Sequence, residues 1–111
     1  PTALFSLGTS VLADALNAIA AQGLRIPQDI SLVAMGDPDF ARSHQPQISS
    51  VTVDLDFAVE DGVRMLLERM RRTTDAPPRR VIVPAQFMLR GSCGPAPTQP
   101  TPSRPRRKAS T

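Results

Sequence analysis

The stretch SLVAMGDPDF, residues 31–40, decides the fold of this chain. Its first five residues carry no charge and are mostly apolar, which is typical of a parallel strand that is buried on both faces. The run stops at Gly36, Asp37 and Pro38, which are turn-forming residues. Asp37 therefore either ends the strand and caps a turn, or accepts hydrogen bonds from a ligand beyond the carboxyl end of the strand. The residues alone leave both interpretations open.

The segment before this strand has the pattern of a shorter strand followed by a helix. Residues 2–7, TALFSL, form an apolar run, and apolar residues then recur at steps of three and four. Thr9 or Ser10 is expected to cap the start of the helix, and Gly23 to close its end.

A second helix is expected over residues 56–72. The pairs Glu60–Arg64 and Glu68–Arg72 are spaced four apart, acidic residues fill the first turns and arginines the last, and both features favour a helix. Its apolar residues share one face; they are Val59, Val63, Leu66, Leu67 and Met70.

Two further strand candidates, VIVP and QFMLR, follow this helix. Alternating strands and helices predict an α/β fold with a largely parallel sheet. We expect residues 1–92 to form the folded part and residues 93–111, which are rich in proline and arginine, to be a disordered basic tail.

The charge distribution argues against direct DNA binding by the folded part. The formal net charge is +3, but four of the 13 basic residues lie among the last eight positions. The remaining nine face ten acidic residues. Because affinity for the phosphate backbone comes from clustered cations, no DNA-binding surface is expected before the tail.

Cysteine content and hydropathy restrict the location and the chemistry. Cys93 is the only cysteine, so it has no partner for an intramolecular disulfide and none at zinc-site spacing. No apolar run approaches the roughly 20 residues that cross a bilayer, and no signal peptide opens the chain. A cytoplasmic protein without a metal or a membrane partner is expected.

No enzyme constellation is present among the polar residues. Gly8, Thr9 and Ser10 could receive an anion at a helix start or could only begin the helix, and neither a GxGxxG nor a GxxxxGK[ST] motif supports a nucleotide cofactor. His44 is the lone histidine and lies in a polar stretch, which favours a surface or subunit contact. The Asp54 and Asp56 carboxylates could form a pair, but their place before a helix favours N-capping.

Four strings of the sequence together resemble one protein family. They are PTALFSLGTSVLADALNAIAAQGLRIPQDISLVAMGD, QPQISSVTVD, GVRMLLERM and RRVIVPAQFMLRGS. In this order and spacing they are similar to the C-terminal part of a lactose-repressor-type (LacI/GalR) transcription regulator, and the resemblance covers residues 1–92.

The resemblance implies a partial periplasmic-binding-protein-like (type I) sensor domain, in which two α/β lobes close on a small effector. Residues 1–50 and 80–92 would belong to the C-terminal lobe, and the helix at 56–72 to the N-terminal lobe. The chain would cross between the lobes near Val53 and Pro84, in two hinge strands that allow lobe closure.

The resemblance also implies an effector site at Thr9, Gly36, Asp37 and Leu55. The family usually has Asn-Asp where this chain has Gly8-Thr9, a second acid in place of Gly36, and an aromatic residue in place of Leu55. Asp37 is the one matching acid. Fewer acidic groups leave room for an anionic effector, because carboxylates avoid one another. A sugar acid is therefore a candidate beside a neutral sugar.

The function implied is the effector-sensing and dimerisation portion of a transcription regulator, usually a repressor and not an enzyme. A homodimer is expected, with His44 at the dimer contact. DNA would be bound only through an N-terminal helix-turn-helix, which is absent from this chain. The alternatives are a periplasmic solute-binding protein of a sugar transporter and, on the same scaffold, an enzyme.

Overall fold

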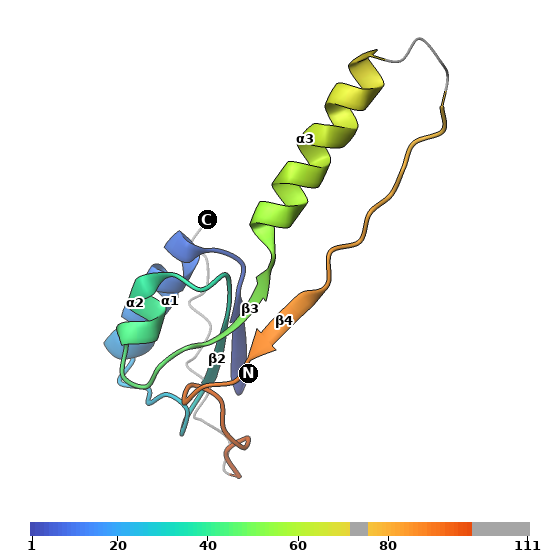
Figure 1. Ribbon diagram of the computed structural model, residues 1–111. Coiled ribbons are helices and arrows are strands. Elements are labelled where there is room, and N and C mark those ends of the chain that lie inside the picture. The colour runs from blue at the N-terminus through green and yellow to red at the C-terminus, as the bar shows by residue number, and fades with distance from the viewer. Residues whose placement is uncertain (72–75, 99–111) are drawn as a thin grey trace, which may run out of the picture.

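The computed structural model describes residues 1–71 and 76–98, which form a four-stranded sheet with two helices against it and a long helix that projects away (Figure 1). The elements are β1 (Ala3–Ser6), α1 (Thr9–Ala21), β2 (Ser31–Met35), α2 (Asp39–Ser43), β3 (Ser49–Val53), α3 (Leu55–Arg71) and β4 (Ala85–Met88). The strands lie in chain order; β1, β2 and β3 run parallel, and β4 is antiparallel to β3. The expected α/β fold with a largely parallel sheet is confirmed.

The structure corrects one predicted strand. Residues 81–84, the VIVP run, pair with no strand in the described part of the chain, because they lie on the path from α3 back to the sheet (Figure 1). The neighbouring candidate forms β4 and is confirmed. The short α2 was not predicted, because five residues are too few for a helical repeat to be visible.

The two ends of α1 differ in how well the sequence predicts them. The N-cap is Gly8, not Thr9 or Ser10, and no side chain caps the helix. Thr9 is already the first helical residue, so its hydroxyl is one position too late to act as a cap. The expected end is confirmed: Gly23 has φ 67°, a conformation that favours glycine.

The C-terminus of α1 forms a Schellman motif. The Gly23 N–H donates to the Ala20 carbonyl at 2.9 Å, and the Leu24 N–H donates to the Ile19 carbonyl at 3.2 Å. Leu24 also packs against the core to which Ile19 belongs, as is usual for the residue after the glycine.

Within residues 1–71 and 76–98, helices cover only one face of the sheet. The core there is made by residues of α1, β2, α2 and the loops beside them, namely Leu12, Ile19, Ile30, Leu32, Ala34, Ala41 and Ile48. Alternation and strand register place Phe5, Met35 and Phe87 on the other face, where they are 49%, 48% and 57% exposed. A parallel sheet is normally buried on both faces, but no other element of the described residues covers this second face.

Helix α3 extends away from the sheet with the returning segment 76–84 beside it (Figure 1). The radius of gyration is 20.0 Å, whereas a compact domain of about 100 residues has about 13 Å. The predicted apolar face of α3 is exposed along its length, at Val59, Val63, Leu66, Leu67 and Met70. Among the described residues, no helix is both long and apolar enough to span a membrane.

The charged residues of α3 pair differently from the prediction. The guanidinium of Arg64 contacts Asp61 and, at 3.4 Å, Glu68, and not the expected Glu60. Asp61 is the buried residue of the helix, so the arginine turns toward it. The predicted partner of Glu68, Arg72, lies outside the described residues, as do residues 99–111 of the expected tail.

Candidate functional site

The predicted site residues follow the carboxyl ends of three neighbouring strands. Thr9 comes after β1, Gly36 and Asp37 come after β2, and Leu55 comes after β3. Because these strands are parallel, their carboxyl ends meet at one edge of the sheet, which is where open α/β folds bind ligands. His44 precedes β3 and therefore lies toward the opposite edge.

The turn between β1 and α1 presents Thr9 to solvent. Thr9 is exposed in the first turn of the helix. The buried Ser6 hydroxyl donates to the Gly8 carbonyl at 3.2 Å, and the Leu12 N–H donates to the same carbonyl at 2.9 Å. The turn is thus fixed from beneath, while its outer side stays open.

Gly36 turns the chain at the end of β2. Its φ is 91°, a value that side chains rarely allow, and its N–H donates to the Val51 carbonyl at 2.8 Å. The hydrogen bonding of β2 to β3 thus continues to Gly36. A residue with a side chain at this position would have to adopt a strained backbone, so the turn favours glycine.

The carboxylate of Asp37 is occupied by an arginine that the sequence interpretation had not singled out. Arg90 donates from its two terminal nitrogens to the two carboxylate oxygens, at 2.6 and 2.8 Å. Each side chain is only 12% exposed. Arg42 adds a third contact at 3.3 Å.

These contacts change the protonation of Asp37. The hydrogen bonds from Arg90, followed by its positive charge and by Arg42, lower the pKa of the Asp37 carboxyl to about 2, although burial opposes the shift. The carboxylate is therefore charged at all physiological pH values. Asp37 is one half of a largely buried ion pair, and the effector contact predicted for it stays a prediction.

Arg90 makes several other contacts around the start of β3. Its guanidinium donates to the Ile48 carbonyl at 2.7 Å and lies 3.5 Å from the Ser50 hydroxyl. Its backbone N–H donates to the Ser49 hydroxyl at 2.9 Å. Arg90 and Asp37 are 53 residues apart, so their contact is not visible in the sequence. The register of β4 on β3 reveals it: Met88 pairs with Ser50, and Arg90, two residues later, lies on the same face of the sheet as Ser50.

The start of α3 confirms one predicted cap. A carboxylate oxygen of Asp54 accepts the Phe57 N–H at 3.0 Å, and its carbonyl accepts the Ala58 N–H at 3.1 Å. Asp56 lies exposed in the first turn. Leu55, between them, is 66% exposed. The N-capping interpretation of Asp54 is therefore confirmed.

His44 ends α2 and is partly buried. Its Nδ1 lies 2.9 Å from the Pro46 carbonyl, so the ring is held against its own loop. The dimer contact predicted for it stays a prediction. Among residues 1–71 and 76–98, no three His, Cys, Asp or Glu side chains cluster in a way that could hold a metal.

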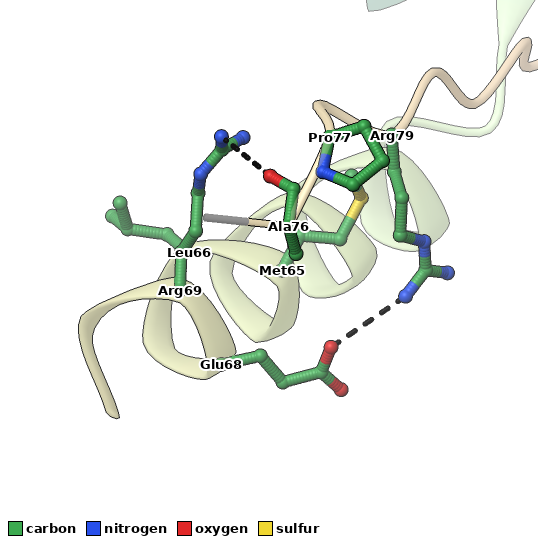
Figure 2. A pocket seen from close by; sticks show the side chains of 7 residues that line it. All are labelled: Met65, Leu66, Glu68, Arg69, Ala76, Pro77 and Arg79. Atoms are coloured by element: carbon green, nitrogen blue, oxygen red, sulfur yellow. Dashed lines mark hydrogen bonds and ion pairs between the residues drawn. The ribbon is translucent and has the colours of Figure 1, made fainter. Parts of the chain in front are cut away.

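A hollow of about 140 Å³ lies far from this edge, at the outer end of α3 (Figure 2). Arg69 donates across it to the Ala76 carbonyl at 3.3 Å, and Arg79 lies 3.5 Å from Glu68. Ligand sites usually enclose about 300 to 1,000 Å³, and the polar groups of this hollow already pair with one another or with the backbone. The edge formed by the strand ends is the better candidate.

Comparison with known proteins places most of the chain in one family. The model of the periplasmic binding protein-like domain matches residues 1–93. The probable opine utilization operon repressor of Rhizobium rhizogenes is 28% identical over 92 residues, which are 83% of this chain and 46% of that protein. The probable HTH-type transcriptional repressor ExuR of Bacillus subtilis is 30% identical over 92 residues, which are 83% of this chain and 27% of that protein.

A solved structure agrees with these sequence matches. The complex of the transcriptional regulator CelR with cellobiose superimposes with a TM-score of 0.72 at 26% identity, over 82% of this chain and 28% of that one. The chain thus spans less than half the length of each of these relatives.

Proposed function

Since the chain belongs to the periplasmic binding protein-like domain family, we propose that it is the C-terminal part of the effector-binding domain of a LacI-type transcriptional repressor. The two related repressors and the cellobiose-bound regulator support this role. The periplasmic solute-binding alternative is not favoured, because these relatives are regulators of transcription.

The observation that carries the proposal is that the chain leaves the sheet and returns to it through two adjacent segments. The chain leaves the sheet from β3 at Val53, enters α3, and returns through residues 76–84 to β4 (Figure 1). Since β3 pairs with β4, and Val53 pairs with Ala85, the two crossings lie side by side. Two neighbouring connections between two bodies are the arrangement of a hinge.

The uncovered apolar surfaces support a second lobe. One face of the sheet and the apolar face of α3 expose several large side chains, more than a monomer usually leaves in contact with water. In the proposed domain, α3 would join the core of the N-terminal lobe, and that lobe would be supplied by residues outside this chain. Homodimerisation, with His44 at the contact, is part of the same proposal.

The proposed effector site is the strand-end edge with Thr9, Gly36, Asp37 and Leu55. Within it, Asp37 is already neutralised by Arg90, and Thr9, Gly36 and Leu55 carry no charge. These four residues therefore contribute no net negative charge that would repel a carboxylate. We therefore propose a sugar or, preferentially, a sugar acid as the effector.

The proposal is tested first by translating the coding DNA in frame upstream of the Pro1 codon. A helix-turn-helix followed by another α/β lobe is expected. That complete protein is then titrated calorimetrically with galacturonate and gluconate, and with glucose and cellobiose as neutral controls.

Micromolar binding of an acid, together with a change in DNA affinity, is the expected result. Tight binding of a neutral sugar with both acids inert would refute the sugar-acid preference. A secretion signal in place of the helix-turn-helix would refute the proposal that the protein regulates transcription.

A further inference from the structure

The Asp37–Arg90 pair is more elaborate than a surface ion pair. Both carboxylate oxygens accept a hydrogen bond from the same guanidinium, and each side chain is only 12% exposed. The geometry is the bidentate one in which arginine cannot be replaced by lysine without loss. Burial of such a pair is costly unless the remaining donors are satisfied, and here the Ile48 carbonyl takes one of them.

The pair joins parts of the chain that are distant in sequence. Asp37 lies in the turn between β2 and α2, the Ile48 carbonyl lies just before β3, and Arg90 lies just after β4. The Ser49 hydroxyl accepts the Arg90 N–H and itself donates to the Arg90 carbonyl, which fixes the backbone that carries the guanidinium. The turn at the proposed effector site is therefore tied to the strand that returns from α3.

We propose that Arg90 is a positioning residue of the effector site: it holds the Asp37 carboxylate, so that Asp37 fixes the turn at residues 36–38 and does not bind the effector directly. This inference rests on the proposed function and deepens it. The effector would then meet the backbone of this turn and the uncharged residues at the edge. Because β4 leads directly back to the crossing at Pro84, Arg90 would also link the state of the turn to lobe movement.

The exposed pair Arg25–Asp29 provides a matched control. Its guanidinium contacts both oxygens of one carboxylate, at 3.0 and 3.1 Å, as Arg90 does, but Arg25 is 72% exposed and lies in the loop between α1 and β2. Removing this pair deletes the same chemistry without touching the strand-end edge.

The experiment compares Arg90→Met, Arg90→Lys, Asp37→Asn, the double variant Asp37→Asn/Arg90→Met and the control Arg25→Met in the complete protein. Amide hydrogen exchange follows the Gly36 N–H, which is bonded to Val51, and so reports on the turn without any effector. Calorimetry with galacturonate and glucose measures effector affinity, and circular dichroism checks folding.

If Arg90 positions the turn, Arg90→Met and Asp37→Asn each accelerate Gly36 exchange about tenfold and weaken effector binding by a similar factor. The effect of the double variant is smaller than the two single effects combined, because both single variants remove the same Asp37–Arg90 interaction. Arg90→Lys, which keeps the charge, restores part of the protection and serves if Arg90→Met does not fold. Arg25→Met changes neither quantity.

Unchanged Gly36 exchange in Arg90→Met would overturn the inference. So would loss of effector binding in Asp37→Asn while Arg90→Met binds normally, since Asp37 would then contact the effector itself. If the unaltered protein binds neither probe, the effector proposal fails for these probes, while the exchange measurement still decides whether Arg90 holds the turn.

Discussion

The neighbours of Asp37 in the sequence do not reveal the residue that it contacts in the structure. Its neighbours Gly36 and Pro38 indicate only a turn, and the end of a parallel strand indicates a ligand site. The actual partner, Arg90, enters from a strand far along the chain and takes both carboxylate oxygens.

The pKa of Asp37 predicts a specific loss of stability in acid. Its value in the folded protein is about 2, below the usual 3.8, so the ion pair contributes its full stability above about pH 4. That contribution, about 2 kcal/mol at most, is lost as the pH falls through 2. Urea unfolding should show the protein more stable than Asp37→Asn at pH 5, with the difference in unfolding free energy shrinking toward pH 2. A difference that does not change with pH would contradict this assignment.

The cap of α3 gives a second prediction at a single side chain. Asp54→Ala should lower the free energy of unfolding by about 1 kcal/mol, because the Phe57 N–H loses its acceptor. Asp56→Ala is the control: Asp56 also lies in the first turn, but no described side-chain hydrogen bond depends on it. Chemical denaturation of both variants measures the effect, and equal losses would argue against a specific cap.

Helix α1 is flanked by glycines at both ends, and no side-chain hydrogen bond caps its start. Gly8 is the N-cap, and Gly23 begins the segment that closes the Schellman motif. The closing glycine is recognisable in sequence because it follows the last apolar step of the helix. The opening glycine is not recognisable, because Thr9 is an equally good capping residue, Ser10 is a better one, and both directly follow Gly8.

A pair of glycine substitutions should separate backbone conformation from helix propensity. Gly23→Ala should destabilise the protein by about 1 kcal/mol, since its φ is 67°. Gly62→Ala, inside α3 and with open space around its Cβ position, should stabilise it by about 0.5 to 1 kcal/mol. Thermal unfolding of the two variants should therefore shift in opposite directions, and a shift in the same direction would contradict this account of Gly23.

In the part of the chain that the structure describes, no layer covers the apolar surfaces of α3 and of one face of the sheet. Helix α3 projects from the sheet, and the sheet has one uncovered face (Figure 1). In the proposed two-lobe domain these surfaces would become parts of two cores. Alone, the 111-residue chain exposes them to water.

We therefore expect the isolated chain to bind the dye ANS and to self-associate at micromolar concentration. Replacing Val63 and Leu66, which are 51% and 58% exposed, by lysine should reduce both effects. Glu60→Lys changes the charge of the same helix without removing apolar surface and should have little effect. Dye fluorescence and sedimentation velocity measure the outcome, and a monomeric, dye-free isolated chain would contradict it.

The sequence by itself indicated three of the strands, β1, β2 and β4, and the helices α1 and α3, but neither β3 nor α2. Helical steps of three and four, uncharged apolar runs and the glycine after α1 are local signals, because backbone conformation and burial on one face depend on nearby residues. The order of strand, turn and helix then places Thr9, Gly36 and Asp37 after predicted strands, whereas only the resemblance to the family indicated Leu55.

Only the tertiary structure decided what these residues contact. The pairing of Asp37 with Arg90 depends on the register of β4 against β3, and the absence of a strand at residues 81–84 depends on there being no neighbouring strand to supply hydrogen bonds. Both are consequences of which segments meet in space. The spacing of apolar residues in α3 predicts which face of the helix is apolar. It does not predict which residues, if any, pack against that face.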